Sequence, residues 1–161
     1  MRKLLLIVWL LIPVVAGAYH YGPGQERLFL DEAAYLIGKA EKHAEAGEHA
    51  EAASIYAEAL DLLPVEKIQK AREIRLERAK AQMLSKQLPE ARADLQTLLN
   101  ELTEDKRANP KLTDEVRSTL ANSQYYMTWL MRLEGRSREE WEPEIEASRQ
   151  NYRLLAEKSK T

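Results

Sequence analysis

Hydrophobic residues are distributed in two different ways along the chain. Residues 4–18 read LLLIVWLLIPVVAGA, an apolar run without a charged side chain, and the positive pair Arg2 and Lys3 precedes it. As a helix, this run would rise about 22 Å, which is less than the roughly 30 Å hydrocarbon core of a bilayer. Pro13 interrupts the run near its end. From residue 26 onward, apolar positions recur instead at helical spacing.

The N-terminal run is typical of a secretory signal peptide. A positive head, an apolar middle and small residues at Ala16 and Ala18 predict cleavage after Ala18. The alternative is that residues 1–18 are an uncleaved N-terminal membrane anchor. Both interpretations place the rest of the chain outside the cytoplasm, because the positive head favours the inner side of the membrane. Residues 19–25 contain Gly-Pro-Gly and are predicted to be a spacer.

The remaining pattern predicts an all-α domain of about six helices over residues 26–161. A first helix ends at Gly47, and a second runs over 49–63 before Pro64. A second pair of helices with the same arrangement is predicted over 66–86 and 89–102. A polar loop over 103–112 follows, and then a fifth helix over 113–134 with Thr113 as its N-cap. A short turn over 137–142 and a sixth helix over 143–158 complete the prediction. Because the connections are short, consecutive helices are expected to pack antiparallel.

Composition changes this picture mainly by excluding classes of protein. Hydrophobic residues make up 45% of the chain and charged residues 31%, which suits a folded helical domain. The absence of cysteine excludes a disulfide framework and a cysteine nucleophile. A formal net charge of −2 gives no cationic excess for phosphates, so no nucleic-acid partner is expected.

Candidate chemistry is equally sparse. The sequence contains no glycine-rich phosphate loop and no Gly-x-Ser-x-Gly elbow. His43 and His49 are expected at the ends of two different helices, which argues against a shared metal. Paired carboxylates such as Glu139 and Glu140 fit solvated helix faces. The sequence therefore predicts a protein without enzymatic activity, cofactor or metal.

Residues 33–64 read AAYLIGKAEKHAEAGEHAEAASIYAEALDLLP and carry the pattern of a helical hairpin with small residues where its helices cross. Small side chains allow two helix backbones to approach, an aromatic side chain fills the gap toward the next unit, and a glycine makes the turn. This segment resembles the tetratricopeptide repeat, and degenerate units over 72–103 and 113–158 are similar to it. In the second unit, Lys86 stands where the turn glycine would be. The signature positions are Ala40, Gly47, Ala52, Tyr56, Ala59, Pro64, Ala79 and Ala91.

This resemblance implies a short right-handed solenoid of helical hairpins, whose first helices line a concave face that binds protein partners. Carried over to this chain, the concave face is mixed and partly apolar, which suits an amphipathic helix or an extended segment of a partner. The residues expected to bind the partner are Ile37, Glu41, Leu76, Lys80, Met83, Asn122, Tyr125, Tyr126 and Trp129.

The fifth predicted helix is rich in aromatic residues. Tyr126 and Trp129 form a second apolar stripe beside the one that contains Leu120 and Leu130. A helix that is apolar on two sides is expected to contact two neighbouring helices, so core packing is the favoured interpretation. The alternative is an exposed aromatic patch that anchors a partner.

Together these patterns predict an exported or membrane-tethered scaffold that mediates protein–protein interaction. The alternative is a structural or assembly subunit of a membrane-associated complex, held mainly by its N-terminal anchor. Membrane contact is expected only through residues 4–18, and only if they are not cleaved. Because so few hairpins are near the lower limit for independent stability, a homo-oligomer is also compatible with the sequence.

Overall fold

The structure, a computed structural model, describes residues 9, 11–13, 17 and 23–159. Within these residues the regular secondary structure is entirely α-helical, which confirms the all-α prediction. The helices beyond residue 22 are α2 (Pro23–Glu45), α3 (His49–Leu62), α4 (Ile68–Leu84), α5 (Leu88–Glu104), α6 (Pro110–Leu133) and α7 (Arg138–Lys158). The predicted signal peptide or anchor over 1–18 lies largely outside the described residues. Among the helices that are described, none combines the length and the hydropathy needed to cross a membrane.

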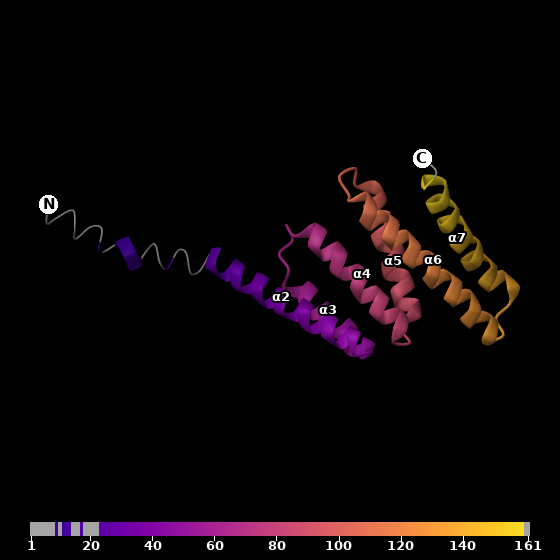
Figure 1. The fold of residues 1–161 in the computed structure, drawn as a ribbon, viewed down its shortest axis with the longest axis horizontal. Helices are drawn as coiled ribbons and strands as arrows, with labels where there is room; N and C mark the ends of the chain where they lie inside the picture. The colour runs from indigo at the N-terminus through magenta and orange to yellow at the C-terminus, as the bar shows by residue number, and fades with distance from the viewer. Residues whose placement is uncertain (1–8, 10, 14–16, 18–22, 160–161) are drawn as a thin grey trace.

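The helices follow one another in space in the order in which they occur in the sequence (Figure 1). Each packs chiefly against the next, so that α2/α3, α4/α5 and α6/α7 form three hairpins in a row. α4 also touches α6, which makes the first helices of the second and third hairpins neighbours.

All three hairpin turns have the same backbone geometry. Each contains one residue in the left-handed region: Gly47 at φ 80°, Lys86 at φ 64° and Gly135 at φ 73°. In each turn the next residue donates its N–H to the carbonyl five positions earlier, over 2.9 to 3.1 Å. This arrangement satisfies carbonyls at the end of the first helix and reverses the chain direction.

Small side chains at helix crossings allow close packing within the first two hairpins. One core cluster joins α2, α3 and α4 around Ala40, Ala52 and Ile55. A second joins α4, α5 and α6 around Ala91, Leu95 and similar aliphatic side chains. The two clusters share helix α4, so burial is continuous along the row rather than concentrated at one centre.

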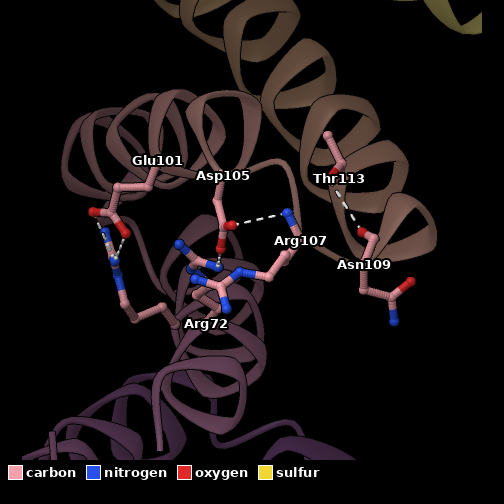
Figure 2. A network of polar contacts seen from close by, with 7 residues as sticks. Arg72, Glu101, Asp105, Arg107, Asn109 and Thr113 are labelled. Carbon is pink, nitrogen blue, oxygen red and sulfur yellow. Dashed lines mark hydrogen bonds and ion pairs between the residues drawn. The ribbon is translucent and has the colours of Figure 1, made fainter. Parts of the chain in front are cut away.

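Arginine–carboxylate pairs join α4 to α5 along the edge of their hairpin. The pairs are Arg72–Asp105, Arg75–Glu101 and Arg78–Asp94. Arg72 is buried and donates to Asp105 over 2.7 Å, while the backbone N–H of Arg107 donates to the same carboxylate over 2.9 Å (Figure 2). The hydrogen bond from Arg72, aided by the Arg107 backbone, lowers the pKa of Asp105 below its ordinary value.

The start of α6 differs from the prediction. The segment expected to be a loop to residue 112 ends three residues earlier, because Asn109 caps the helix and Pro110 occupies its first position. The Asn109 side chain accepts the backbone N–H of Lys111 over 3.0 Å. Thr113, expected to be the cap, lies inside the helix and its hydroxyl donates to the Asn109 carbonyl (Figure 2). Proline is favoured at the first helical position, since its missing N–H would have no partner there.

The start of α7 also differs. The sequence predicted a short turn over 137–142 and a helix from Pro143, whereas one continuous helix begins at Arg138. The Glu140 carboxylate accepts the backbone N–H of Ser137 over 2.9 Å, which holds the helix start at Ser137. Pro143 lies exposed in the second turn and removes only one helical hydrogen bond.

The predicted spacer over 19–25 is partly helical. α2 begins at Pro23, because proline is favoured at the first helical position. Residues 23–25 of the predicted spacer therefore belong to the helix. Residues 19–22 lie outside the part of the chain that the structure describes.

Candidate functional site

The repeat-signature residues lie where helices meet. Their alanines are at most 1% exposed, and Tyr56 is 3% exposed. Gly47 makes the α2–α3 turn, and Pro64 follows the end of α3. These positions therefore contribute to packing and to chain reversal rather than to a surface. The buried alanines are Ala40, Ala52, Ala59, Ala79 and Ala91.

Five of the residues predicted to bind a partner lie in α2 and α4, and they fall into three groups by exposure. Leu76 is 1% exposed and belongs to the core, so its assignment to a binding surface is wrong. Ile37 and Met83 are half-buried and pack against the core clusters. Glu41 is exposed and Lys80 is partly exposed, so these two polar side chains remain accessible.

Lys80 connects α4 with α6. Its ammonium donates to Glu77 in its own helix and to Glu115 in α6, in each case over 2.7 Å. Burial alone would lower the pKa of Lys80, but these two carboxylates outweigh it and raise the pKa above its ordinary value. Burial, with the nearby charges of Glu77 and Glu41, raises the pKa of Tyr56 to about 12. The face shared by α2, α4 and α6 thus holds a network of charges around Lys80.

The aromatic residues of α6 are on the surface, which makes core packing the wrong interpretation for them. Tyr125, Tyr126, Trp129 and Leu133 are 52%, 51%, 60% and 65% exposed. Their spacing places them on one side of the helix, opposite the buried side that contains Val116 and Leu120. We call these four residues the α6 stripe. The rings of Tyr125 and Tyr126 meet edge to face, with centroids 5.8 Å apart.

Asn122 extends the same side of α6 by one turn. It accepts a hydrogen bond from the hydroxyl of Tyr152 in α7 over 2.5 Å. Burial, together with the nearby Tyr126, raises the pKa of Tyr152 above its ordinary value. This contact fixes α7 beside the α6 stripe, and it gives the predicted binding residue Asn122 a structural partner.

A cleft of about 400 Å³ lies between the C-terminal half of α6 and the N-terminal half of α7. We call it the α6/α7 cleft. Thr128, which is 5% exposed, is its most buried lining residue. Two residues of the α6 stripe line it, together with aromatic, aliphatic and charged side chains of α7. The lining residues are Tyr125, Thr128, Trp129, Arg132, Arg138, Trp141, Glu142, Ile145, Glu146 and Arg149.

Sequence reasoning assigned no residue of α7 to the binding surface. The resemblance assigns partner binding to the first helix of each hairpin, and α7 is the second helix of the third hairpin. The predicted turn over 137–142 also left Trp141 outside the helix that contains Ile145. The pattern of Ser137 followed by Glu140 held the signal, since it starts the helix early enough to place both apolar residues on the side that faces α6.

The described residues present no group of three or more His, Asp or Glu side chains suited to a metal ion. Nδ1 of His43 lies 2.5 Å from a carboxylate oxygen of Glu48 at the surface of the α2–α3 turn. His49 lies at the first position of α3 and forms no part of that contact. The two histidines therefore belong to helix ends, as the sequence suggested.

Comparison with protein families, with curated proteins and with solved structures finds no match for this chain.

Proposed function

We propose that this chain is a non-enzymatic scaffold of the tetratricopeptide-like kind, exported or tethered outside the cytoplasmic membrane, which holds a protein partner on the face lined by α2, α4 and α6. The observation that carries the proposal is the α6 stripe. Four large apolar side chains, each more than half exposed, gather on one side of a single helix. Contiguous apolar surface rimmed by polar residues is typical of a protein-binding site, and Tyr and Trp are enriched among the residues that dominate binding energy.

Regularity along the row supports a repeat architecture. The three hairpin turns share one backbone geometry, although only two of them use glycine. Helices pack in sequence order, and buried alanines lie at the crossings in the first two hairpins. Each hairpin buries its apolar side only by stacking on the next, which is the packing logic of a solenoid.

The polar part of the proposed binding face is preorganised. Lys80 bridges α4 and α6 through Glu115, and Tyr152 fixes Asn122 beside the α6 stripe. Side chains that are already held in place lose little conformational entropy when a partner arrives. Binding by shape and a few anchors requires no covalent chemistry, which fits the lack of catalytic motifs in the sequence.

The alternative function, an assembly subunit held mainly by its anchor, is favoured by the N-terminal end of α2. This helix has 23 residues and its partner α3 has 14, so its first turns extend beyond α3 (Figure 1). Leu28 and Phe29 in that part are 58% and 43% exposed. An exchange of residues 1–18 for a cleavable signal peptide separates the two functions, because a scaffold keeps its partner and an anchored subunit loses its complex.

Site-specific photocrosslinking tests the scaffold proposal. A benzoylphenylalanine is incorporated at Trp129 in the full chain expressed in its native cell, and the matched control carries it at Arg153, an exposed residue of α7 outside the cleft. We expect a specific adduct at Trp129, and we expect the purified partner to bind the unmodified chain more tightly than Trp129→Ala. Equal adducts at both positions, or equal affinity for both proteins, would contradict the proposal.

Export has its own test. Mass spectrometry of the protein from fractionated cells identifies its N-terminus: a chain that begins at Tyr19 outside the cytoplasm indicates cleavage, and a membrane-bound chain that retains residues 1–18 indicates an anchor. An intact chain confined to the cytosolic fraction would contradict export.

A further inference from the structure

The α6/α7 cleft is lined by both apolar and charged side chains. Trp129 and Tyr125 from α6 face Trp141 and Ile145 from α7, and the buried Thr128 lies between the helices. A volume of about 400 Å³ is at the lower end of small-ligand sites, so it suits one or two side chains of a bound segment rather than a large cofactor.

The three arginines that line the cleft differ in whether a carboxylate pairs with them. Arg138 donates to Glu142 over 2.6 Å, and Arg149 pairs with Glu146. Arg132 lies with its guanidinium carbon 5.2 Å from the ring centroid of Trp141 and, in the part of the chain that the structure describes, forms no ion pair with a carboxylate. Three arginines and two glutamates line the cleft, so it is locally cationic in a chain whose formal net charge is −2.

An arginine held against an indole ring is well placed to bind a carboxylate. A cation–π contact holds the guanidinium near the ring through the ring's π face, so the contact does not use the N–H groups as hydrogen-bond donors and they can bind another group. A carboxylate matches that edge with two parallel hydrogen bonds, and such charge-assisted pairs are among the strongest in proteins. A neutral apolar ligand would leave these donors unpaired as it displaced their water, which costs affinity.

From this geometry we propose that the α6/α7 cleft binds a segment of a partner protein in which an acidic side chain lies next to a large apolar one. The apolar side chain occupies the space between Trp129, Trp141 and Ile145, and the carboxylate binds Arg132. The inference rests on the proposed scaffold function and names the chemistry of the partner. Occupation by a second copy of this chain is the competing outcome.

Selection from a phage-displayed library of random short peptides tests the proposal, with the full chain as the target. We expect the selected peptides to place Asp or Glu within a few positions of Phe, Trp or Leu. Affinity for a selected peptide should fall about tenfold or more in Arg132→Gln. Arg136→Gln is the matched control, because it removes the same charge from the α6–α7 turn outside the cleft, and it should change affinity less than about twofold.

A charge-reversal variant shows whether a loss of binding comes from the changed charge or from misfolding. Arg132→Glu is expected to select peptides with Lys or Arg in place of the acidic residue, a gain that a damaged protein would not show. Peptides without acidic enrichment, no enrichment at all, or equal affinity losses in Arg132→Gln and Arg136→Gln would overturn the proposal. So would self-association in sedimentation velocity that Trp129→Ala abolishes, because the cleft would then be an interface between copies.

Failure of this inference can be distinguished from failure of the scaffold function. If the partner crosslinked at Trp129 binds wild-type chain and Arg132→Gln equally well, the acidic-segment inference is wrong while the scaffold function stands. If crosslinking at Trp129 yields nothing above the Arg153 control, the scaffold function itself fails.

Discussion

The guanidinium of Arg92 in α5 forms two hydrogen bonds with the carboxylate of Glu144 in α7, 3.1 and 2.7 Å long. The two residues are 52 positions apart and connect the second hairpin to the third. Glu144 is the more enclosed partner, with a side chain 16% exposed. This contact holds α7, and with it the wall of the α6/α7 cleft, against the rest of the row.

Glu144→Gln should destabilise the protein by about 1–3 kcal/mol, because it leaves the Arg92 guanidinium partly buried without its counter-charge. Glu146→Gln is the matched control, since the Glu146–Arg149 pair is well exposed and should contribute less than about 1 kcal/mol. Urea unfolding followed by circular dichroism measures both. Equal changes in the free energy of unfolding would show that the contact between hairpins contributes no more than a surface pair.

Ala52→Leu should destabilise the protein by about 1–3 kcal/mol, because Ala52 is fully buried where α3 crosses its neighbours and extra methylenes would force the helices apart. Ala50→Leu, at an exposed position of the same helix, should change the free energy of unfolding by less than about 0.5 kcal/mol. Thermal or urea unfolding compares the two. A neutral Ala52→Leu would mean that the helices can separate without loss of packing.

Much of this fold could be predicted because its determinants are local. Helical periodicity, the turn at Gly47 and small residues at Ala52 and Ala91 are visible in short stretches of sequence, and the structure contains them at helix ends and crossings. Two helix starts were misplaced because Pro110 and Pro143 were given more weight than the capping residues before them.

The candidate site was less predictable because it depends on which side of each helix meets a neighbour. Periodicity shows that Leu76 and Trp129 lie on apolar stripes, but it does not show that one stripe is covered and the other is exposed. The partner of Arg72 lies 33 residues away, and that of Arg92 lies 52 residues away. Such pairs follow from the stacking of hairpins and leave no signal at short range.

Lys86→Gly should stabilise the protein by about 0.5–1 kcal/mol, because Lys86 adopts a left-handed backbone that costs a residue with a Cβ atom and costs glycine little. Gly47→Ala is the reciprocal change at the same point of the α2–α3 turn. It should destabilise by about 1 kcal/mol from backbone strain alone, since an added Cβ would meet no atom within 4 Å. Urea unfolding of both variants measures the effects, and changes of the same sign would contradict the shared turn geometry.

Stability should fall at alkaline pH partly through Tyr56. Its pKa is raised to about 12 in the folded protein, so between its ordinary value near 10 and pH 12 the unfolded chain loses the proton while the folded chain keeps it. This linkage favours unfolding as pH rises through that window. Tyr56→Phe removes it, so the free energy of unfolding should decline less steeply above pH 10 in the variant than in the wild type. Parallel curves measured by urea unfolding would show that Tyr56 titrates normally.

The Arg72–Asp105 pair predicts that stability falls as the pH decreases in the acid range. Because the pKa of Asp105 is lowered by Arg72 and the Arg107 backbone, its stabilising contribution is complete above the ordinary carboxyl value near 4 and is lost as pH falls through the lower folded value. Asp105→Asn should therefore be less stable than the wild type at pH 7, where the buried Arg72 lacks its counter-charge, and the two should converge below pH 4. Asp61→Asn, at an exposed position of α3, serves as the control and should follow the wild-type curve closely. A constant difference between Asp105→Asn and the wild type from pH 7 to pH 2 would mean that the carboxylate charge does not contribute to holding α4 against α5.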